Sequence, residues 1–175
     1  MEQTTLRKAV ATDALCITRL VNSAYRGEHS KKGWTTEAGL LSGQRTDTAE
    51  ILRLIAEEKE SAILLCLNDG VIVGSVHIEK MSDHANLGMF VVEPTLQGHG
   101  IGKRLLTLAE RTAQQEWGVG TMIMAVITVR HELIAFYERR GYRRTGILKP
   151  FPANPALWTP KVSNLSLELL EKTLT

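Results

Sequence analysis

The sequence predicts one α+β domain over residues 1–175, in which helices flank a mixed, mainly antiparallel sheet. Stretches with strand periodicity and stretches with helical periodicity alternate along the chain. Asn68, Asp69 and Gly70 join two β-prone runs, and Asp-Gly is a strong hairpin signal because both central residues of such a turn need positive φ. No repeat, low-complexity tract or Pro/Gly/Ser-rich linker divides the chain, so a single domain is expected.

The N-terminal half predicts a strand, two helices and the hairpin. Residues 4–10 are β-prone, and the next helix should run from the capping residues Thr12 and Asp13 to about Gly27. Its buried face recurs at i, i+3, i+4 and i+7 and consists of Ile17, Leu20, Val21 and Ala24. After a polar, glycine-rich segment, Asp47 begins a second helix, with a glutamate three residues later as in a capping box.

The C-terminal half predicts strands separated by two further helices. Residues 87–92 form a strand that ends at Pro94, because proline fixes φ and cannot donate to a sheet. A helix with one apolar and one charged face begins at Ile101, and Gly118 can end it. The remaining predicted elements are a buried strand over 121–129, a short helix over 131–140, a strand over 142–147, and a final antiparallel strand in which Leu165, Leu167 and Leu169 alternate with polar residues.

The composition favours a globular protein and gives no sign of a polyanionic partner. Apolar residues make up 43% and charged residues 23% of the chain, and 21 basic against 19 acidic residues leave a net charge of +2. Neither nucleic acid nor a membrane surface is therefore expected as a partner. Cys16 and Cys66 lie in apolar runs without CxxC spacing and are expected in the core. Without a secretory h-region, the chain is predicted to be cytoplasmic. One basic cluster is interpreted as a solvated face, namely Arg139, Arg140, Arg143 and Arg144.

Residues 90–106, FVVEPTLQGHGIGKRLL, place a glycine-rich turn between a strand and the start of a helix. A helix start carries free N–H groups and partial positive charge, so it attracts phosphate or carboxylate groups. Gly98, Gly100 and Gly102 leave the backbone open to a bulky anion. Lys103 and the arginine after it oppose the helix dipole, a cost that a bound anion would offset. The stretch therefore predicts an anion-binding loop.

Two common phosphate-binding motifs do not fit this loop. The P-loop pattern matches at Gly102 and Lys103, but Gln97 stands at its first glycine and Arg104 at its hydroxyl residue. The dinucleotide pattern G-x-G-x-x-G needs its third glycine one residue later than the chain provides it. The remaining pattern, Gln97-x-x-Gly100-x-Gly102, resembles the acetyl-CoA pyrophosphate loop, [Q/R]-x-x-G-x-[G/A], of the GCN5-related N-acetyltransferase (GNAT) superfamily.

The resemblance extends over nearly the whole chain. The sequence FVVEP before the loop looks like the family's fourth strand, and IAFYERRGY, residues 134–142, looks like its FYEKxGF block. The order of elements is similar too. The resemblance implies a GNAT-like fold with splayed fourth and fifth strands. It also implies an acetyl-CoA-dependent N-acetyltransferase, with no metal, that acts on a primary amine of a small molecule, an amino acid derivative or a protein.

The resemblance also implies which residues bind acetyl-CoA. The free edge of the fourth strand, Phe90, Val91 and Val92, would bond the pantetheine amides as if they were an added strand. Phe136 would contact the cofactor. Arg130 stands where many members carry an asparagine that bonds the cofactor, so either Arg130 reaches the cofactor differently or this contact is absent. The pyrophosphate would lie on the loop, formed by Gln97, Gly98, His99, Gly100, Ile101, Gly102 and Lys103.

For the chemistry, the resemblance implies direct attack of the amine on the thioester, through an intermediate stabilised by a backbone donor and without an enzyme nucleophile. Tyr137 matches the tyrosine that in many members protonates the departing CoA thiolate. The other interpretation of Tyr137 is a half-buried core residue at helical spacing from Leu133 and Ile134.

The general base is predicted to be Glu79, with His77 and His84 as alternatives, because the family uses a carboxylate or a water chain near its third and fourth strands. Glu79 and His77 are two residues apart on one strand and hence on one face. Ordinary polar residues on the surface of a strand are the other explanation.

The acceptor pocket is expected to include residues 26–46. In this segment Trp34 and Glu37 would pack against the amine and pair with its charge, or would merely close the surface. The partner is a small-molecule or peptide amine, and a homodimer is compatible with the family. Two alternatives stay open: a non-catalytic CoA-binding module used for sensing or assembly, and an acyltransferase that prefers a longer acyl chain.

Overall fold

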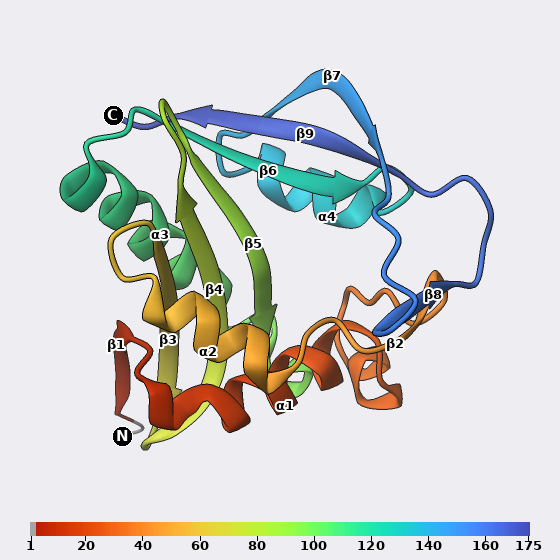
Figure 1. Ribbon diagram of the computed structural model, residues 1–175, viewed down its shortest axis with the longest axis horizontal. Coiled ribbons are helices and arrows are strands. Elements are labelled where there is room, and N and C mark those ends of the chain that lie inside the picture. The colour runs from red at the N-terminus through yellow and green to blue at the C-terminus, as the bar shows by residue number, and fades with distance from the viewer. Residues whose placement is uncertain (1–2) are drawn as a thin grey trace.

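The computed structural model describes residues 3–175 and shows a seven-stranded sheet covered by helices on both faces, with a small two-stranded sheet at one side (Figure 1). Along the sheet the strands are β1 (Thr4–Lys8), β3 (Ser61–Asn68), β4 (Val71–Lys80), β5 (Ala85–Val92), β6 (Thr121–Ile127), β9 (Ser166–Thr173) and β7 (Arg143–Pro150). The α-helices are α1 (Ala14–Tyr25), α2 (Thr48–Ala56), α3 (Ile101–Trp117) and α4 (His131–Glu138). The small sheet pairs β2 (Leu41–Gly43) with β8 (Trp158–Pro160). Strands β5 and β6 run parallel and the other neighbouring strands antiparallel, which confirms the predicted mixed sheet.

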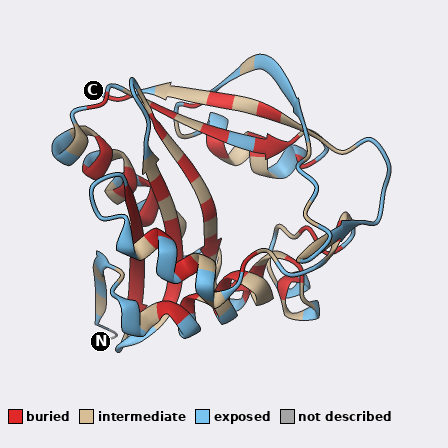
Figure 2. Cartoon of the chain, viewed as in Figure 1, coloured by how far each residue is buried: buried red, intermediate tan, exposed pale blue. Residues whose placement is uncertain are grey.

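Strand β3 is buried on both faces and divides the core into two layers. Leu64 and Cys66 belong to the layer under α3, whereas Ile63, Leu65 and Leu67 belong to the layer under α1 and α2. Figure 2 shows this as red strands at the centre of the sheet. An apolar run without alternation is what a strand covered on both sides requires.

Local signals confirm several predicted boundaries. Asp47 caps α2, since its Oδ1 accepts a hydrogen bond of 2.8 Å from the N–H of Glu50. Asp69 and Gly70 have φ of 48° and 82°, as the hairpin turn between β3 and β4 requires. Gly118 ends α3 in the left-handed conformation.

One prediction about an individual side chain was wrong. Cys16 is exposed, because it lies outside the buried stripe of α1 that begins with Ile17. The predicted final antiparallel strand is confirmed as β9, in which the buried residues are Glu168 and Leu170. Leu167 and Leu169, on the other face of that strand, line a cavity instead of a closed core.

The sheet opens between β5 and β6, the fourth and fifth strands of the predicted order. Pairing is confined to Ala85–Leu87 against Met122–Met124. Beyond this point β5 carries a bulge, with Met89 at φ 43°, and the register with β4 shifts. Because a bulge bends a strand away from its neighbour, the ends of β5 and β6 separate, as Figure 1 shows. This confirms the predicted splay.

Gly74 of β4 allows α3 to pack closely on the sheet. A Cβ at this position would lie 2.7 Å from Leu105 Cδ1 and 3.1 Å from Ile101 Cγ2. We expect Gly74→Ala to lower the free energy of unfolding, measured in urea, by about 1 to 3 kcal/mol, because overpacking forces the core to shift. The control is Gly88→Ala, where the added Cβ meets nothing within 4 Å. Equal losses in both variants would contradict the close packing of α3.

Candidate active site

Two cavities meet where β5 and β6 separate. The first has a volume of about 640 Å³ and lies against the glycine loop, the start of α3 and α4. The second has a volume of about 380 Å³ and lies between β5, β6, β9 and the segments around β2 and β8. Both volumes fall in the range of small-molecule sites. The residues that line both cavities are Tyr25, Phe90, Arg130, Leu133 and Tyr137.

The glycine loop has the shape and the free donors of an anion site. Gly98 and Gly100 have φ of 85° and 82°, and a Cβ at either would project into open space. The N–H groups of Gly98, His99 and Gly100 donate to no acceptor within residues 3–175. The first turn of α3 adds further N–H groups without an intrahelical acceptor. The loop therefore fits a diphosphate, with Lys103 lining the same cavity.

Not every predicted loop residue faces the cavity. Gln97, Gly98, Gly100, Ile101, Gly102 and Lys103 line it, but His99 does not, and its Nδ1 lies 3.0 Å from Leu96 O. The side chain of Gln97 joins the loop to a neighbouring segment: its Oε1 accepts from Trp34 N at 2.9 Å and its Nε2 donates to Val92 O at 3.3 Å. Gly33 makes this contact possible, because a Cβ there would lie 2.2 Å from Gln97 Oε1.

The predicted strand residues Phe90, Val91 and Val92 all line the first cavity. On one side β5 pairs with β4 through Val91 and Val92, while its other edge is past the end of the pairing with β6. That edge can accept a further extended segment by backbone hydrogen bonds. Phe136 completes the wall, with ring centroids 5.4 Å from Trp34 and 6.4 Å from Phe90.

Tyr137 of α4 lies at the junction of the two cavities. Its ring contacts Phe90 and Tyr142, with centroids 6.3 and 5.8 Å away. Its hydroxyl donates to no acceptor in the described part of the chain. Burial raises the pKa of Tyr137 well above its usual value, so the phenol stays protonated at neutral pH and can act as a proton donor.

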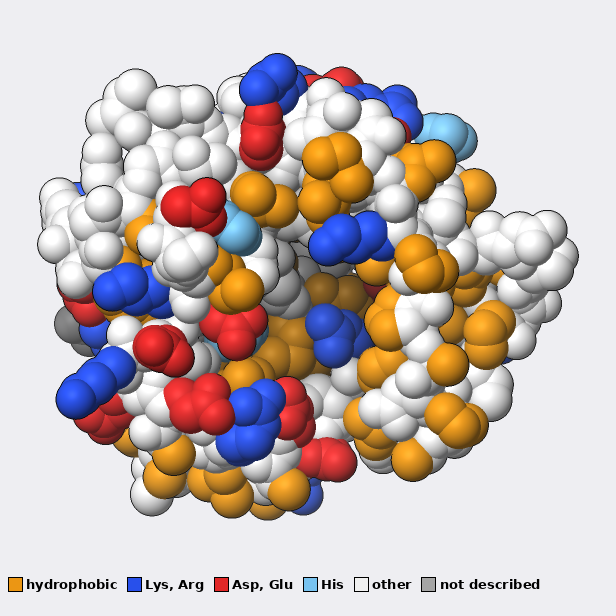
Figure 3. All heavy atoms as spheres, turned by 45° about the horizontal axis from the view of Figure 1, so that its top comes forward, with side chains coloured by type: hydrophobic (Ala, Val, Ile, Leu, Met, Phe, Trp, Pro, Cys, Tyr) orange, Lys and Arg blue, Asp and Glu red, His pale blue; other side chains and the backbone are white. Residues whose placement is uncertain are grey.

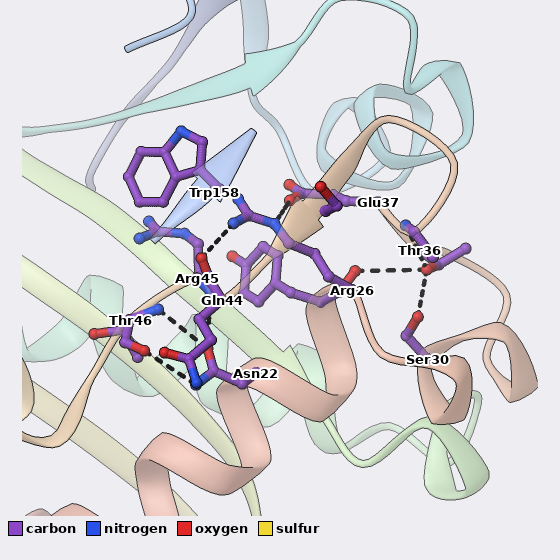
Figure 4. Close-up of polar contacts among 12 residues, drawn as sticks. Asn22, Arg26, Ser30, Thr36, Glu37, Gln44, Arg45, Thr46 and Trp158 are labelled. Atoms are coloured by element: carbon purple, nitrogen blue, oxygen red, sulfur yellow. Dashed lines mark hydrogen bonds and ion pairs between the residues drawn. The ribbon is translucent and has the colours of Figure 1, made fainter. Parts of the chain in front are cut away.

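Arg130 and Glu37 form a buried network with Arg26 instead of standing free. Glu37 Oε1 accepts from Arg130 Nη1 and Glu37 Oε2 from Arg26 Nε, both at 3.0 Å. Arg130 Nη2 donates to Thr35 Oγ1 at 2.6 Å, and Arg26 Nη1 to Gln44 O at 2.7 Å. Figure 4 shows Arg26 held between Glu37 and Gln44. Arg130 and Glu37 both line the second cavity, but the carboxylate of Glu37 already has two cationic partners.

The three base candidates, Glu79, His77 and His84, line neither cavity. Glu79 stands opposite Asn86 in the β4–β5 pairing, so the two side chains share a face of the sheet. Asn86 lines the second cavity. Glu79 is therefore one residue away from the wall of the second cavity.

His77 is a neutral imidazole in the folded protein. Burial, followed by the nearby cations Arg45 and Arg53, lowers its pKa to about 4, against the opposing effect of Glu50 and Glu57. One ring nitrogen lies 2.9 Å from Ser61 Oγ.

The low pKa of His77 makes stability depend on pH. The unfolded chain binds a proton to this histidine near pH 6.5, while the folded protein does so near pH 4. We expect the free energy of unfolding to fall by roughly 2 to 3 kcal/mol from this group as pH falls from about 6.5 to 4. Urea unfolding of the wild type and of His77→Gln at pH 7.5, 5.5 and 4.5 measures it. Parallel pH profiles for the two proteins would contradict the assignment.

Several residues of the cavities were missed from sequence. Arg139 and Arg140, interpreted as a solvated face, line the first cavity, and the Arg140 guanidinium lies 3.5 Å from the centroid of the Phe136 ring. The other half of that basic cluster is paired on the sheet, Arg143 with Glu171 and Arg144 with Glu168. The second cavity contains further residues that were not predicted, among them Lys149, Phe151 and Trp158, whereas its Arg45 falls within the predicted acceptor segment 26–46. Contacts between distant segments create these sites, so no local pattern marks them.

No group of three or more His, Cys, Asp or Glu side chains within residues 3–175 could hold a metal ion. In the same residues, no helix has the length and apolar character needed to cross a bilayer.

Comparison with solved structures shows a shared fold. The ribosomal-protein-S18-alanine N-acetyltransferase of Escherichia coli superposes with a TM-score of 0.71 at 14% identity, covering 99% of this chain and 95% of that one. YncA from Salmonella typhimurium, solved with acetyl-CoA, gives 0.71 at 19%, covering 98% and 94%. The PaiA N-acetyltransferase of Thermoplasma acidophilum, solved with coenzyme A, gives 0.69 at 18%, covering 98% and 99%.

Sequence comparison identifies the family. No curated protein matches the chain. The model of the acetyltransferase (GNAT) family matches residues 20–142, which contain the glycine loop, the separated strands and Tyr137. Because this match covers more than half of the chain, the protein belongs to the acetyltransferase (GNAT) family, and its co-substrate is acetyl-CoA.

Proposed function

We propose that this protein transfers the acetyl group of acetyl-CoA to a primary amine by direct attack of the amine on the thioester. The observation that carries the proposal is the junction of two cavities at Phe90 and Tyr137, where the sheet opens. One cavity has the free donors for a diphosphate, and the other opens on the opposite side of β5. A thioester and an amine that enter from the two sides would meet at this junction.

Each part of the first cavity would have a distinct role. The N–H groups from Gly98 to Lys103 would hold the diphosphate, with Gln97 and Ile101 forming the walls of the loop. The free edge of Phe90 to Val92 would bond the amides of pantetheine. Arg130 would act through its bonds to Glu37 and Thr35, by fixing the wall shared by both cavities.

In the reaction, the amine nitrogen forms a bond to the thioester carbonyl carbon, and the carbon–sulfur bond then breaks. Tyr137 would donate its proton to the departing thiolate. The amine must lose a proton before attack, and Glu79 stays the predicted acceptor of that proton, through water, because it stands beside the cavity wall and not in it. The products are the N-acetylated amine and free CoA.

The test is release of CoA thiol when the purified protein is mixed with acetyl-CoA and a panel of primary amines. We expect an acetyl-CoA KM below about 1 mM, as is usual for enzymes with their substrates, and an N-acetylated product detected by mass spectrometry. Tight binding of CoA without thiol release from any amine would contradict the proposal and favour a sensing or assembly role.

A further inference from the structure

We infer that the acceptor is a small amine that also carries an anionic group, a carboxylate or a phosphonate, bound by Arg45 and Lys149 in the second cavity. The inference rests on the proposed function, since it names the class of amine that this site takes. It draws on the charge, the size and the aromatic lining of the second cavity.

The second cavity carries an excess of positive charge. Its ionisable side chains, besides tyrosine, are four cations and one carboxylate, namely Arg26, Arg45, Arg130, Lys149 and Glu37. Figure 3 shows a hollow with hydrophobic side chains on its floor, Lys and Arg side chains at its rim, and Asp and Glu side chains on the surface beside it. An ammonium group alone would be repelled from such a site, whereas an anionic group would be attracted.

Glu37, the carboxylate that lines this cavity, is already paired and cannot neutralise the remaining cations. Both oxygens of Glu37 accept hydrogen bonds of 3.0 Å from Arg26 and Arg130, and all three side chains are less than 10% exposed. The other two cations that line the cavity are Arg45 and Lys149. Neither side chain has a hydrogen bond or ion pair with any residue from 3 to 175.

Arg45 is held in position although its charge is unpaired. Its backbone N–H donates to Asn22 Oδ1 at 2.8 Å, which fixes the segment to α1. Its guanidinium lies 5.5 Å from the centroid of the Tyr25 ring. Figure 4 shows Arg45 beside Arg26 and Trp158. Glu50 of α2 and Glu57 at its C-terminal cap are paired with Arg53 and do not line the cavity.

The position of these cations gives the bound acceptor a direction. Arg45 and Lys149 line the second cavity and not the first, so they lie on the side away from the glycine loop. An anionic group bound there would leave the amine to point toward Tyr137, which lines both cavities. Phe151 and Trp158, whose ring centroids are 6.2 Å apart, form an apolar wall for the carbon skeleton between the two polar ends.

The same charges help to generate the reactive form of the amine. Nearby cations disfavour a second positive charge and so lower the pKa of a bound ammonium group. The neutral amine, which is the nucleophile, is therefore favoured in this cavity. This holds although Glu37, the carboxylate that lines the cavity, is already paired with two arginines. A volume of about 380 Å³ suits a compact molecule rather than a folded protein chain.

The experiment compares matched amines at a fixed, saturating concentration of acetyl-CoA. The panel consists of the proteinogenic α-amino acids, the amine that each gives on loss of its carboxylate, the corresponding amides, and α-aminophosphonates, with short peptides as a further arm. We expect the best amine that carries an anionic group to exceed its neutral counterpart by at least about 100-fold in kcat/KM. This is the effect of one or two charge-assisted hydrogen bonds. The arms with carboxylate and phosphonate show which oxyanion the site prefers.

Variants locate the preference in the cavity. The preference is kcat/KM for the amine that carries an anionic group, divided by kcat/KM for its neutral counterpart. In Arg45→Met this ratio should fall by at least about tenfold, while the KM for acetyl-CoA stays unchanged. Lys149→Met, on β7, provides a second test in a separate element. The matched control is Arg19→Met, an exposed arginine on the outer side of α1, which should keep the wild-type ratio. Thermal melting of all variants verifies that they fold.

The possible outcomes separate the two proposals. The inference would be overturned if neutral amines or peptides were acetylated with a kcat/KM equal to or higher than that of amines with an anionic group. The acetyltransferase proposal would then still stand. A wild-type ratio in folded Arg45→Met and Lys149→Met would also overturn the inference. No thiol release from any amine, with CoA bound tightly, would count against the proposed function itself.

Discussion

Tyr137→Phe should lower kcat by roughly 100-fold or more while leaving the dissociation constant of acetyl-CoA nearly unchanged, because a positioned general acid contributes about that much. The ring of Tyr137 keeps its contacts with Phe90 and Tyr142 in this variant, so only the proton donor is lost. The phenol is suited to donate, since burial holds its pKa well above the usual value. Stopped thiol assays give kcat, and titration with acetyl-CoA gives the affinity.

Tyr142→Phe is the matched control for this effect. Tyr142 is also buried, and its ring packs edge-on against Tyr137. Its hydroxyl, however, donates to Glu110 Oε1 at 2.9 Å and lines neither cavity. This variant should lose about 1 kcal/mol of stability and little activity. Equal kcat values for the wild type and Tyr137→Phe would remove the general acid from the mechanism.

Gly100→Ala should raise the dissociation constant of acetyl-CoA by roughly 10- to 100-fold, the effect of losing or distorting one hydrogen bond to a charged group. The added Cβ would project from the N-terminus of α3 into the space where the diphosphate is proposed to lie. Isothermal titration with CoA and with acetyl-CoA measures the change.

Gly70→Ala separates this effect from backbone strain. Gly70 and Gly100 have the same φ of 82°, and a Cβ at either meets nothing within 4 Å. Both variants should therefore lose about 1 to 2 kcal/mol of stability from the left-handed backbone. Gly70 lies in the turn between β3 and β4, away from both cavities, so its affinity for CoA should stay at the wild-type value. Equal affinities for the two variants would argue against the loop as the diphosphate site.

Local sequence signals predicted most of the secondary structure and the first cavity. The turn at Asp69 and Gly70, the cap at Asp47 and the glycine loop depend on residues close together in the chain. Such features follow from backbone conformations that only certain residues adopt easily. The residues predicted for acetyl-CoA were carried over from the family's loop and strand patterns, and all but His99 line the first cavity.

The second cavity could not be predicted in the same way. It depends on the pairing of β2 with β8, elements of three residues each that lie far apart in the sequence. Glu37 illustrates the difficulty: its partners, Arg26 and Arg130, are 11 and 93 residues away. The sequence suggested that the Glu37 carboxylate would pair with the positive charge of an amine, whereas in the fold this carboxylate is paired with two arginines. Charge excess in a cavity is a property of tertiary contacts, and no short pattern reports it.

The most direct test of the account is a crystal structure of the protein with CoA bound. The measured quantities are the distances from the diphosphate oxygens to the backbone nitrogens of residues 98–103, and the position of the sulfur relative to β5 and β6. We predict hydrogen-bond distances at the loop and the sulfur at the opening of the sheet beside Tyr137. A diphosphate bound elsewhere, or a sulfur outside the junction of the two cavities, would contradict the account.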